Sequence, residues 1–183
     1  IQEFEKFDDI ELHIVAPHYG IHGVQQFEMD GVNYHFFQSE DDNLFSLLLS
    51  RFLHKLKRSY SRNTKTILHF IDQIKPDIIH YIGAENPYYS ESALYIPEGV
   101  PLMVSLQTLM CDPEFFKNYP ISKEEYEYRK NLEVAIIKKV DYVASKVMPF
   151  REIIQRTIGD VKFLDMTLAV GETINDSSNI SKQ

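Results

Sequence analysis

The stretch that decides the fold is Lys75-Pro76-Asp77-Ile78-Ile79-His80-Tyr81-Ile82-Gly83-Ala84-Glu85. Its apolar run, residues 78–82, stands between a proline and a glycine and is too short for a helix, which is typical of a buried strand. The run is apolar on both faces, and strands covered on both sides occur in parallel sheets. We therefore predict a central strand of a parallel sheet here.

Three other apolar runs end, like this one, in a short polar tip. They cover residues 10–16, 101–106 and 142–144, and the four tips are residues 17–20, 83–86, 107–108 and 145–146. Segments with helical spacing lie between most of the runs, and strands that alternate with helices indicate a parallel sheet. Ligands of such sheets bind outside the carboxyl ends of the strands. The polar tips therefore mark the expected functional edge.

The remaining pattern completes an α/β, Rossmann-like parallel sheet flanked by helices. Residues 17–31 are predicted as a loop and residues 44–56 and 67–74 as amphipathic helices. Ser122 and Glu125 form a capping box that opens a helix to Lys139. Further strands are expected at residues 32–37 and 161–164, and further helices at residues 90–96 and 149–157. Residues 10–16 resemble the second strand of a Rossmann unit, so the first strand and its helix are expected to be missing from this piece.

Composition and charge narrow the function classes. The chain has 19 basic and 27 acidic residues and a net charge of −8, so we expect no nucleic-acid partner. The single cysteine, Cys111, excludes an internal disulfide and suits a reducing compartment. No apolar run approaches the roughly 20 residues of a membrane span. Residues 1–170 are interpreted as one lobe, and residues 171–183 as a polar tail or truncated linker.

Three blocks of the chain, together with residues 28–35, resemble one enzyme family. Residues 75–85, residues 100–108 and the segment from Glu133 to Ser145 are similar, in order and spacing, to successive elements of the two-lobed glycosyltransferases. The resemblance is to the retaining, family 4-like enzymes, which include relatives of sucrose synthase and bacterial mannosyltransferases. It covers roughly residues 11 to 167. It implies that the chain is the N-terminal, acceptor-binding lobe.

The resemblance also implies an activity for a longer protein. The full enzyme would transfer a sugar from a nucleotide-sugar donor, held by an absent C-terminal lobe, to a glycan or lipid-linked acceptor in bacterial cell-envelope polysaccharide biosynthesis. It would need no metal or other cofactor. It would act in the cytoplasm, with peripheral contact at the inner membrane face left open. We expect this piece alone to be inactive.

Five residues at the strand tips are the candidate substrate contacts: Gln107, Glu85 and His18, with Tyr19 and Tyr88 behind them. Many relatives carry a histidine at the position of Gln107. The glutamine keeps a hydrogen-bond donor and an acceptor but cannot act as a base. Glu85 has two interpretations, as a ligand for sugar hydroxyls or as a cap of the following helix. Tyrosine faces stack on sugar rings, although tyrosine pairs are also common in cores.

Several other residues receive a structural interpretation. His18 and His22 have no acidic or thiol partner nearby in sequence, so no metal site is expected. His80 is predicted to be a core histidine, and Arg129 and Glu133 could form an ion pair along their helix. A free-standing, non-catalytic, Rossmann-like ligand-binding module remains the alternative for the whole chain.

Overall fold

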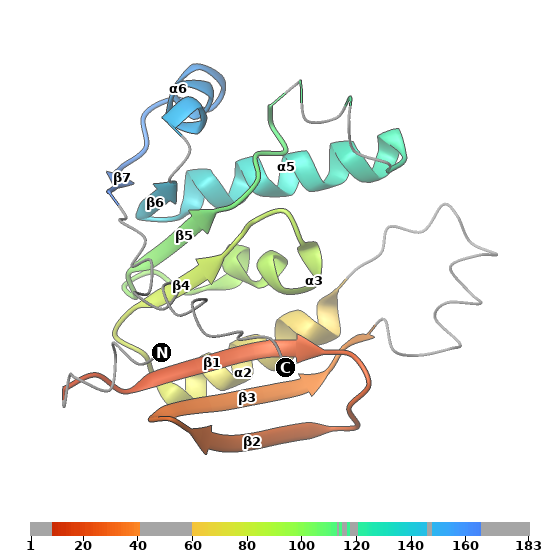
Figure 1. Cartoon of the computed structure of the whole chain (residues 1–183), viewed down its shortest axis with the longest axis vertical. Helices are drawn as coiled ribbons and strands as arrows, with labels where there is room; N and C mark the ends of the chain where they lie inside the picture. The colour runs from red at the N-terminus through yellow and green to blue at the C-terminus, as the bar shows by residue number, and fades with distance from the viewer. Residues whose placement is uncertain are drawn as a thin grey trace, which may run out of the picture.

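A computed structural model describes residues 9–40, 60–112, 114, 117, 121–145 and 148–165. In this part of the chain the strands form two sheets, and the larger sheet lies above the smaller one in the view of Figure 1. The larger sheet is parallel, has four strands and is flanked by helices, so the predicted α/β class is confirmed. The predicted helix at residues 44–56 and the tail at 171–183 lie outside the described residues.

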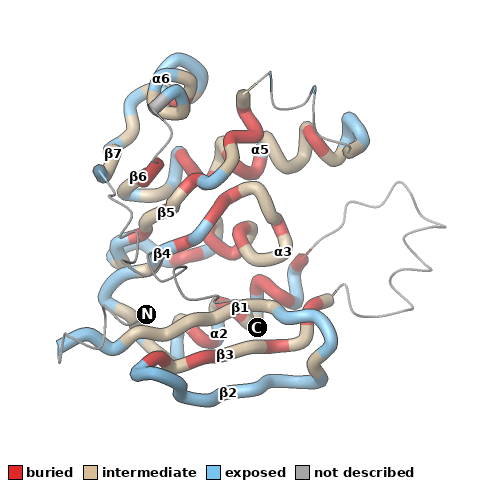
Figure 2. The backbone as a smooth tube through the Cα atoms, viewed as in Figure 1, coloured by how far each residue is buried: buried red, intermediate tan, exposed pale blue. Residues whose placement is uncertain are grey.

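The smaller sheet contains β1 (Leu12–His18), β3 (Val32–Gln38) and β2 (Val24–Met29), in that spatial order. β1 pairs with β3 in parallel, and β2 pairs with β3 in antiparallel register. The predicted loop at residues 17–31 is therefore wrong in its second half. Strand β2 is exposed along its whole length (Figure 2), so no buried face imposed an apolar alternation that the sequence would show.

The resemblance compares residues 28–35 with a hairpin region, and the hairpin between β2 and β3 lies there, but its own turn signal was missed. Its two-residue turn is Asp30-Gly31, and both residues have positive φ, 53° and 70°. A type I′ turn requires positive φ at both central positions, and Asp-Gly is one of the dipeptides that accept it. The turn dipeptide, and not the strand's own composition, predicts this hairpin.

The larger sheet contains β4 (Ile79–Ile82), β5 (Leu102–Leu106), β6 (Tyr142–Ser145) and β7 (Phe163–Leu164), all parallel and in chain order. The prediction that residues 78–82 form a central strand is wrong for the described residues, because β4 lies at the sheet's edge. Ile78 and Ile82 are 57% and 60% exposed. His80 is not a core residue either: its exposed ring lies with Nε2 2.6 Å from the Ser105 hydroxyl oxygen.

Within the described residues, helices are present where they are predicted, although the one expected at 67–74 begins earlier and the segment expected at 90–96 is mainly a 3₁₀ turn. They are α2 (Ser61–Ile74), α3 (Pro87–Ser90), the 3₁₀ turn η3 (Glu91–Tyr95), α5 (Lys123–Lys139) and α6 (Met148–Thr157). One half of the predicted capping box of α5 is confirmed, because the Ser122 hydroxyl accepts a hydrogen bond from the Glu125 backbone amide at 3.2 Å, whereas Glu125 Oε1 pairs with Arg129. Helix α2 ends at Lys75, which has φ 53° and donates its amide to the Ile71 carbonyl. Pro76 follows this cap and prevents the helix from continuing.

One helical layer serves both sheets. Residues of α2, η3 and α5 pack against the apolar face of the larger sheet, where Tyr81, Val104 and Val143 are buried. Phe70 of α2 also packs with Phe37 of the smaller sheet. Ile71 and Tyr89 contact both apolar clusters. The two sheets are therefore held against the same layer of helices.

Candidate functional site

Two of the candidate residues follow neighbouring strands at the same edge of the larger sheet. Ile82 of β4 is in register with Ser105 of β5, so Glu85 and Gln107 lie a few residues beyond the carboxyl ends of paired parallel strands. Gln107 is exposed and Glu85 is half-buried. This is the edge at which ligands of parallel α/β sheets bind.

Gly83 gives the Glu85 side chain its position. Gly83 has φ 90°, and a Cβ on it would lie 2.6 Å from Glu85 Oε2 and 2.7 Å from the Tyr89 hydroxyl. The carboxylate therefore folds back over the backbone of the turn, into space that any other residue at position 83 would fill. Glycine is required here both for its backbone conformation and for this close approach.

The Glu85 carboxylate has one oxygen without a hydrogen-bond donor. Oε1 accepts a hydrogen bond from the side-chain Nδ2 of Asn86 at 3.3 Å, whereas Oε2 is buried and has no partner among the described residues. The N-cap residue of α3 is Asn86, so Glu85 is not at the capping position. A carboxylate oxygen accepts hydrogen bonds only, and leaving one buried and unsatisfied is costly. Oε2 is therefore suited to accept a hydrogen bond from a ligand.

Tyrosine rings gather beside this carboxylate. Tyr19, which follows β1, has its ring centroid 6.3 Å from that of Tyr88 on α3, although 69 positions separate them in the sequence. Tyr88 also contacts Tyr89 edge-on at 4.9 Å and Tyr60 at 6.5 Å. Burial, and then the nearby charge of Glu85, raise the pKa of Tyr88 and Tyr89. These phenols remain protonated at neutral pH, and Tyr89 donates to the Ile82 carbonyl oxygen at 2.6 Å.

The other candidates are less closely assembled. His18 ends β1, is exposed, and packs its ring at 5.6 Å from that of Phe36. Gln107, beyond the end of β5, is also exposed. The structure thus brings together Glu85, Tyr88 and Tyr19, whereas His18 contacts Phe36 of the smaller sheet.

Glu133 supports the turn that carries Gln107, and sequence reasoning missed this role. The Glu133 side chain is completely buried, and its two oxygens accept hydrogen bonds from the amides of Met110 and Cys111 at 2.9 and 2.8 Å. The predicted ion pair with Arg129 is wrong, because Arg129 Nε lies 2.6 Å from Glu125 Oε1 instead. The position of Glu133 among the apolar residues of α5 was the sequence signal for a buried, hydrogen-bonded carboxylate.

Burial dominates the electrostatics around Glu133. It raises the pKa of Glu133 to about 7, although the two backbone amides act in the opposite direction. The neighbouring thiol of Cys111 has its pKa raised to about 12 by burial and by the charge of Glu133. Cys111 is therefore a protonated, buried thiol and not a nucleophile.

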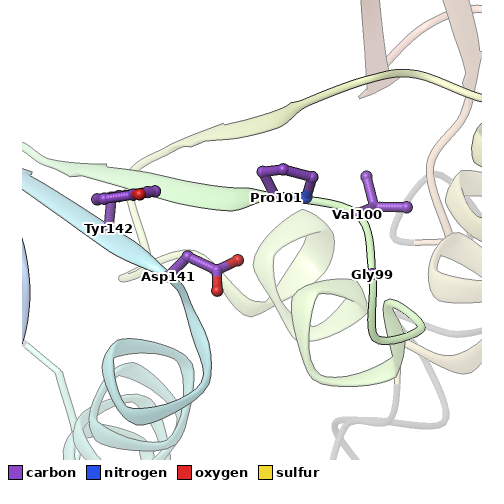
Figure 3. Close-up of a pocket in the computed structure, with 5 residues that line it drawn as sticks. All are labelled: Gly99, Val100, Pro101, Asp141 and Tyr142. Carbon is purple, nitrogen blue, oxygen red and sulfur yellow. The ribbon is translucent and has the colours of Figure 1, made fainter.

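A shallow hollow of about 210 Å³ lies at the other edge of the larger sheet, lined by Gly99, Val100, Pro101, Asp141 and Tyr142 (Figure 3). These residues surround the amino ends of β5 and β6, away from Gln107. The Asp141 carboxylate is already engaged, because Oδ2 accepts a hydrogen bond from the Leu102 amide at 2.8 Å. Asp141 therefore joins the starts of β5 and β6, since its own amide also donates to the Leu102 carbonyl oxygen.

Comparison with known proteins adds no assignment: no protein-family model matches the chain, and no curated protein matches its sequence. In the part of the chain that the structure describes, none of the helices is both long and apolar enough to cross a membrane. The same residues contain no group of three or more His, Cys, Asp or Glu side chains placed to hold a metal ion.

Proposed function

We propose that this chain is the acceptor-binding, N-terminal lobe of a two-lobed retaining glycosyltransferase. The observation that supports the proposal best is the buried Glu85 oxygen without a donor, beside the tyrosine rings at the carboxyl edge of β4. In this proposal the donor nucleotide-sugar binds a second lobe. The acceptor is a glycan or lipid-linked sugar of bacterial cell-envelope polysaccharide synthesis at the cytoplasmic side of the membrane.

The chemistry of the site fits a polyhydroxylated ligand. A sugar hydroxyl would donate to Glu85 Oε2, and the ring of Tyr88 or Tyr19 would cover an apolar face of the sugar. The exposed Gln107 amide can both donate and accept. The lobe would hold the attacking hydroxyl in place, so its contribution to the rate would come from proximity and orientation. None of its residues needs to act as a base.

Glycan binding by the purified chain tests the proposal. We would screen the chain on an array of bacterial oligosaccharides and titrate the best ligand into the wild-type protein and into Glu85→Gln. The variant keeps the shape and can keep the oxygen that accepts from Asn86, but it replaces the second oxygen with an NH₂ group that cannot accept a hydrogen bond, so we expect at least tenfold weaker binding. Glu98→Gln, at the exposed turn before β5, is the matched control and should bind as the wild type does.

A titration of the chain with nucleotide-sugars separates the acceptor lobe from the free-standing ligand-binding module. Micromolar affinity for a nucleotide-sugar by this chain alone would favour the free-standing ligand-binding module over the acceptor lobe. Equal glycan affinity of the wild type and Glu85→Gln would refute the site, and a folded chain that binds no glycan would refute the proposal.

A further inference from the structure

Strand β2 leaves one edge of the smaller sheet open. It is the strand of that sheet farthest from the larger sheet (Figure 1), and in the described part of the chain it pairs only with β3. The Gln38 amide donates to the Gly23 carbonyl oxygen, so residues 23, 25, 27 and 29 are the ones that share hydrogen bonds with β3. The backbone groups of residues 24, 26 and 28 therefore point away from the sheet.

The edge of β2 lacks the features that usually prevent pairing between sheets. Its sequence, Val24-Gln25-Gln26-Phe27-Glu28-Met29, contains no proline and no lysine, and its register with β3 is unbroken by a bulge. All six residues are exposed. Proline, lysine and bulges are among the means by which natural proteins protect edge strands. Strand β2 is therefore a regular template on which another strand can pair.

Exposed apolar side chains lie along the same strand. Of the eight large hydrophobic residues that are exposed in the described part of the chain, three belong to β2: Val24, Phe27 and Met29. Phe27 is 44% exposed, although its ring stacks on the buried Tyr34 at 5.1 Å and meets Phe36 edge-on. Exposed apolar residues that cluster indicate an interaction surface, whereas single ones need no explanation. This cluster continues to the open backbone edge.

We propose that β2 pairs with β2 of a second copy of this chain, in antiparallel register about a two-fold axis that passes through the sheet at Phe27. The two smaller sheets then form one six-stranded sheet, with three strands from each copy. Both copies use the same edge, so the pairing closes at two copies. The dimer does not depend on the proposed glycosyltransferase activity, and it leaves the edge that carries Glu85 uncovered.

The side chains of β2 fit this register. With the outward backbone groups at residues 26 and 28, Phe27 forms a non-hydrogen-bonded pair with the partner's Phe27, and at such pairs opposite side chains come closest. Gln26 then faces the partner's Glu28, and its NH₂ group can donate to that carboxylate, once on each side of the axis. No like charges lie opposite each other, which favours a second copy as the occupant. A register with Gln26 at the axis would instead place Glu28 opposite the partner's Val24.

Sedimentation equilibrium over a range of concentrations tests the proposal. Six residues from each copy take part, against roughly 20 on each side of a stable complex, so the dimer should be weak. The mass should rise from 21.4 kDa in dilute solution toward twice that value. Gln26→Glu places like charges opposite each other and should weaken the dimer about tenfold, whereas Gln26→Lys should tighten it. Gln155→Glu and Gln155→Lys, at an exposed position of α6, are the matched controls for the change in net charge.

Disulfide formation tests the register. Phe27→Cys brings two thiols together at the axis, within the reach of a disulfide, so oxidised glutathione should crosslink this variant at concentrations where the dimer forms. Gln25→Cys is the matched control, because residue 25 would face the partner's Met29 and should stay uncrosslinked. Cys111 is buried and should take no part in either variant.

Four results would overturn the proposal. The first is a wild-type chain that stays monomeric up to about 1 mM. The second is equal weakening of the dimer by Gln26→Glu and Gln155→Glu. The third is a dimeric chain in which Phe27→Cys crosslinks no faster than Gln25→Cys. The fourth is protection of the Gln26 and Glu28 amides from hydrogen exchange in the dilute monomer, which would show that another part of the same chain covers this edge.

Discussion

Raising the pH from 5 to 8 should destabilise this chain through one buried carboxyl group, that of Glu133. Burial raises the pKa of Glu133 from 4.5 to about 7, so the folded chain holds this proton more tightly than the unfolded chain does. The contribution to stability is complete below pH 4.5 and is lost as the pH rises to 7. At about 1.4 kcal/mol per pKa unit, the loss amounts to about 3 kcal/mol.

Urea unfolding at a series of pH values measures this contribution. The free energy of unfolding would be compared between the wild type and Glu133→Gln, because groups that titrate elsewhere then cancel in the difference. The glutamine turns its NH₂ group toward one of the two backbone amides that Glu133 accepts. The variant should therefore be less stable than the wild type by about 1–3 kcal/mol at low pH, from one unsatisfied amide.

The difference between the two proteins should then change with pH by about 3 kcal/mol in favour of the variant, between pH 4.5 and 7, and stay constant above that range. Glu127→Gln, which removes a carboxylate from a partly exposed ion pair with Lys130, is the matched control for the substitution itself. A pH-independent difference for Glu133→Gln would refute the reasoning. It would show that the two backbone hydrogen bonds offset burial, so that Glu133 binds its proton equally well in the folded and the unfolded chain.

Three further changes have defined outcomes. Gly83→Ala should lower the free energy of unfolding by more than the roughly 1–3 kcal/mol of backbone strain expected for Gly99→Ala, because only at Gly83 would the Cβ contact Glu85. A smaller fall in melting temperature for Gly83→Ala than for Gly99→Ala would contradict the predicted clash. Asn63→Ala should lower the free energy of unfolding by about 2–4 kcal/mol, since this fully buried amide bonds two separate backbone segments, and urea melts showing no change would contradict that role. Cys111 should react with iodoacetamide at pH 8 far more slowly than free cysteine, and at the free rate in urea; fast labelling of the native chain would contradict its burial.

Burial determined how much of the fold could be predicted. The runs that became β3, β5 and β6, and helix α2, have apolar residues that pack in the cores, and their apolar patterns predict them, whereas α5 is predicted from its N-terminal residues Ser122 and Glu125. Strand β2 has no buried face, so its residues show no such pattern. The edge position of β4 could not be predicted from the sequence, because a strand with one neighbouring strand can have the same apolar run as a strand with two.

Only part of the candidate site could be predicted from the sequence. Glu85 and Gln107 could be assigned to one edge because parallel strands bring their carboxyl ends together. The approach of Tyr19 to Tyr88 depends on how the smaller sheet packs against the helices, which no local pattern encodes. The hydrogen bonds of Glu133 likewise join a helix to a turn more than twenty residues away.

The order of strands in the larger sheet has a consequence for how the chain assembles. Because β4, β5, β6 and β7 lie side by side in chain order, each strand leaving the ribosome meets a partner that has already been made. Pairing can therefore advance vectorially during synthesis, one helix-linked step at a time. β1 differs, since it must wait until β2 has been made before β3 can pair with it. The β2–β3 hairpin is thus complete before Tyr88 has been synthesised, and the contact between Tyr19 and Tyr88 forms later.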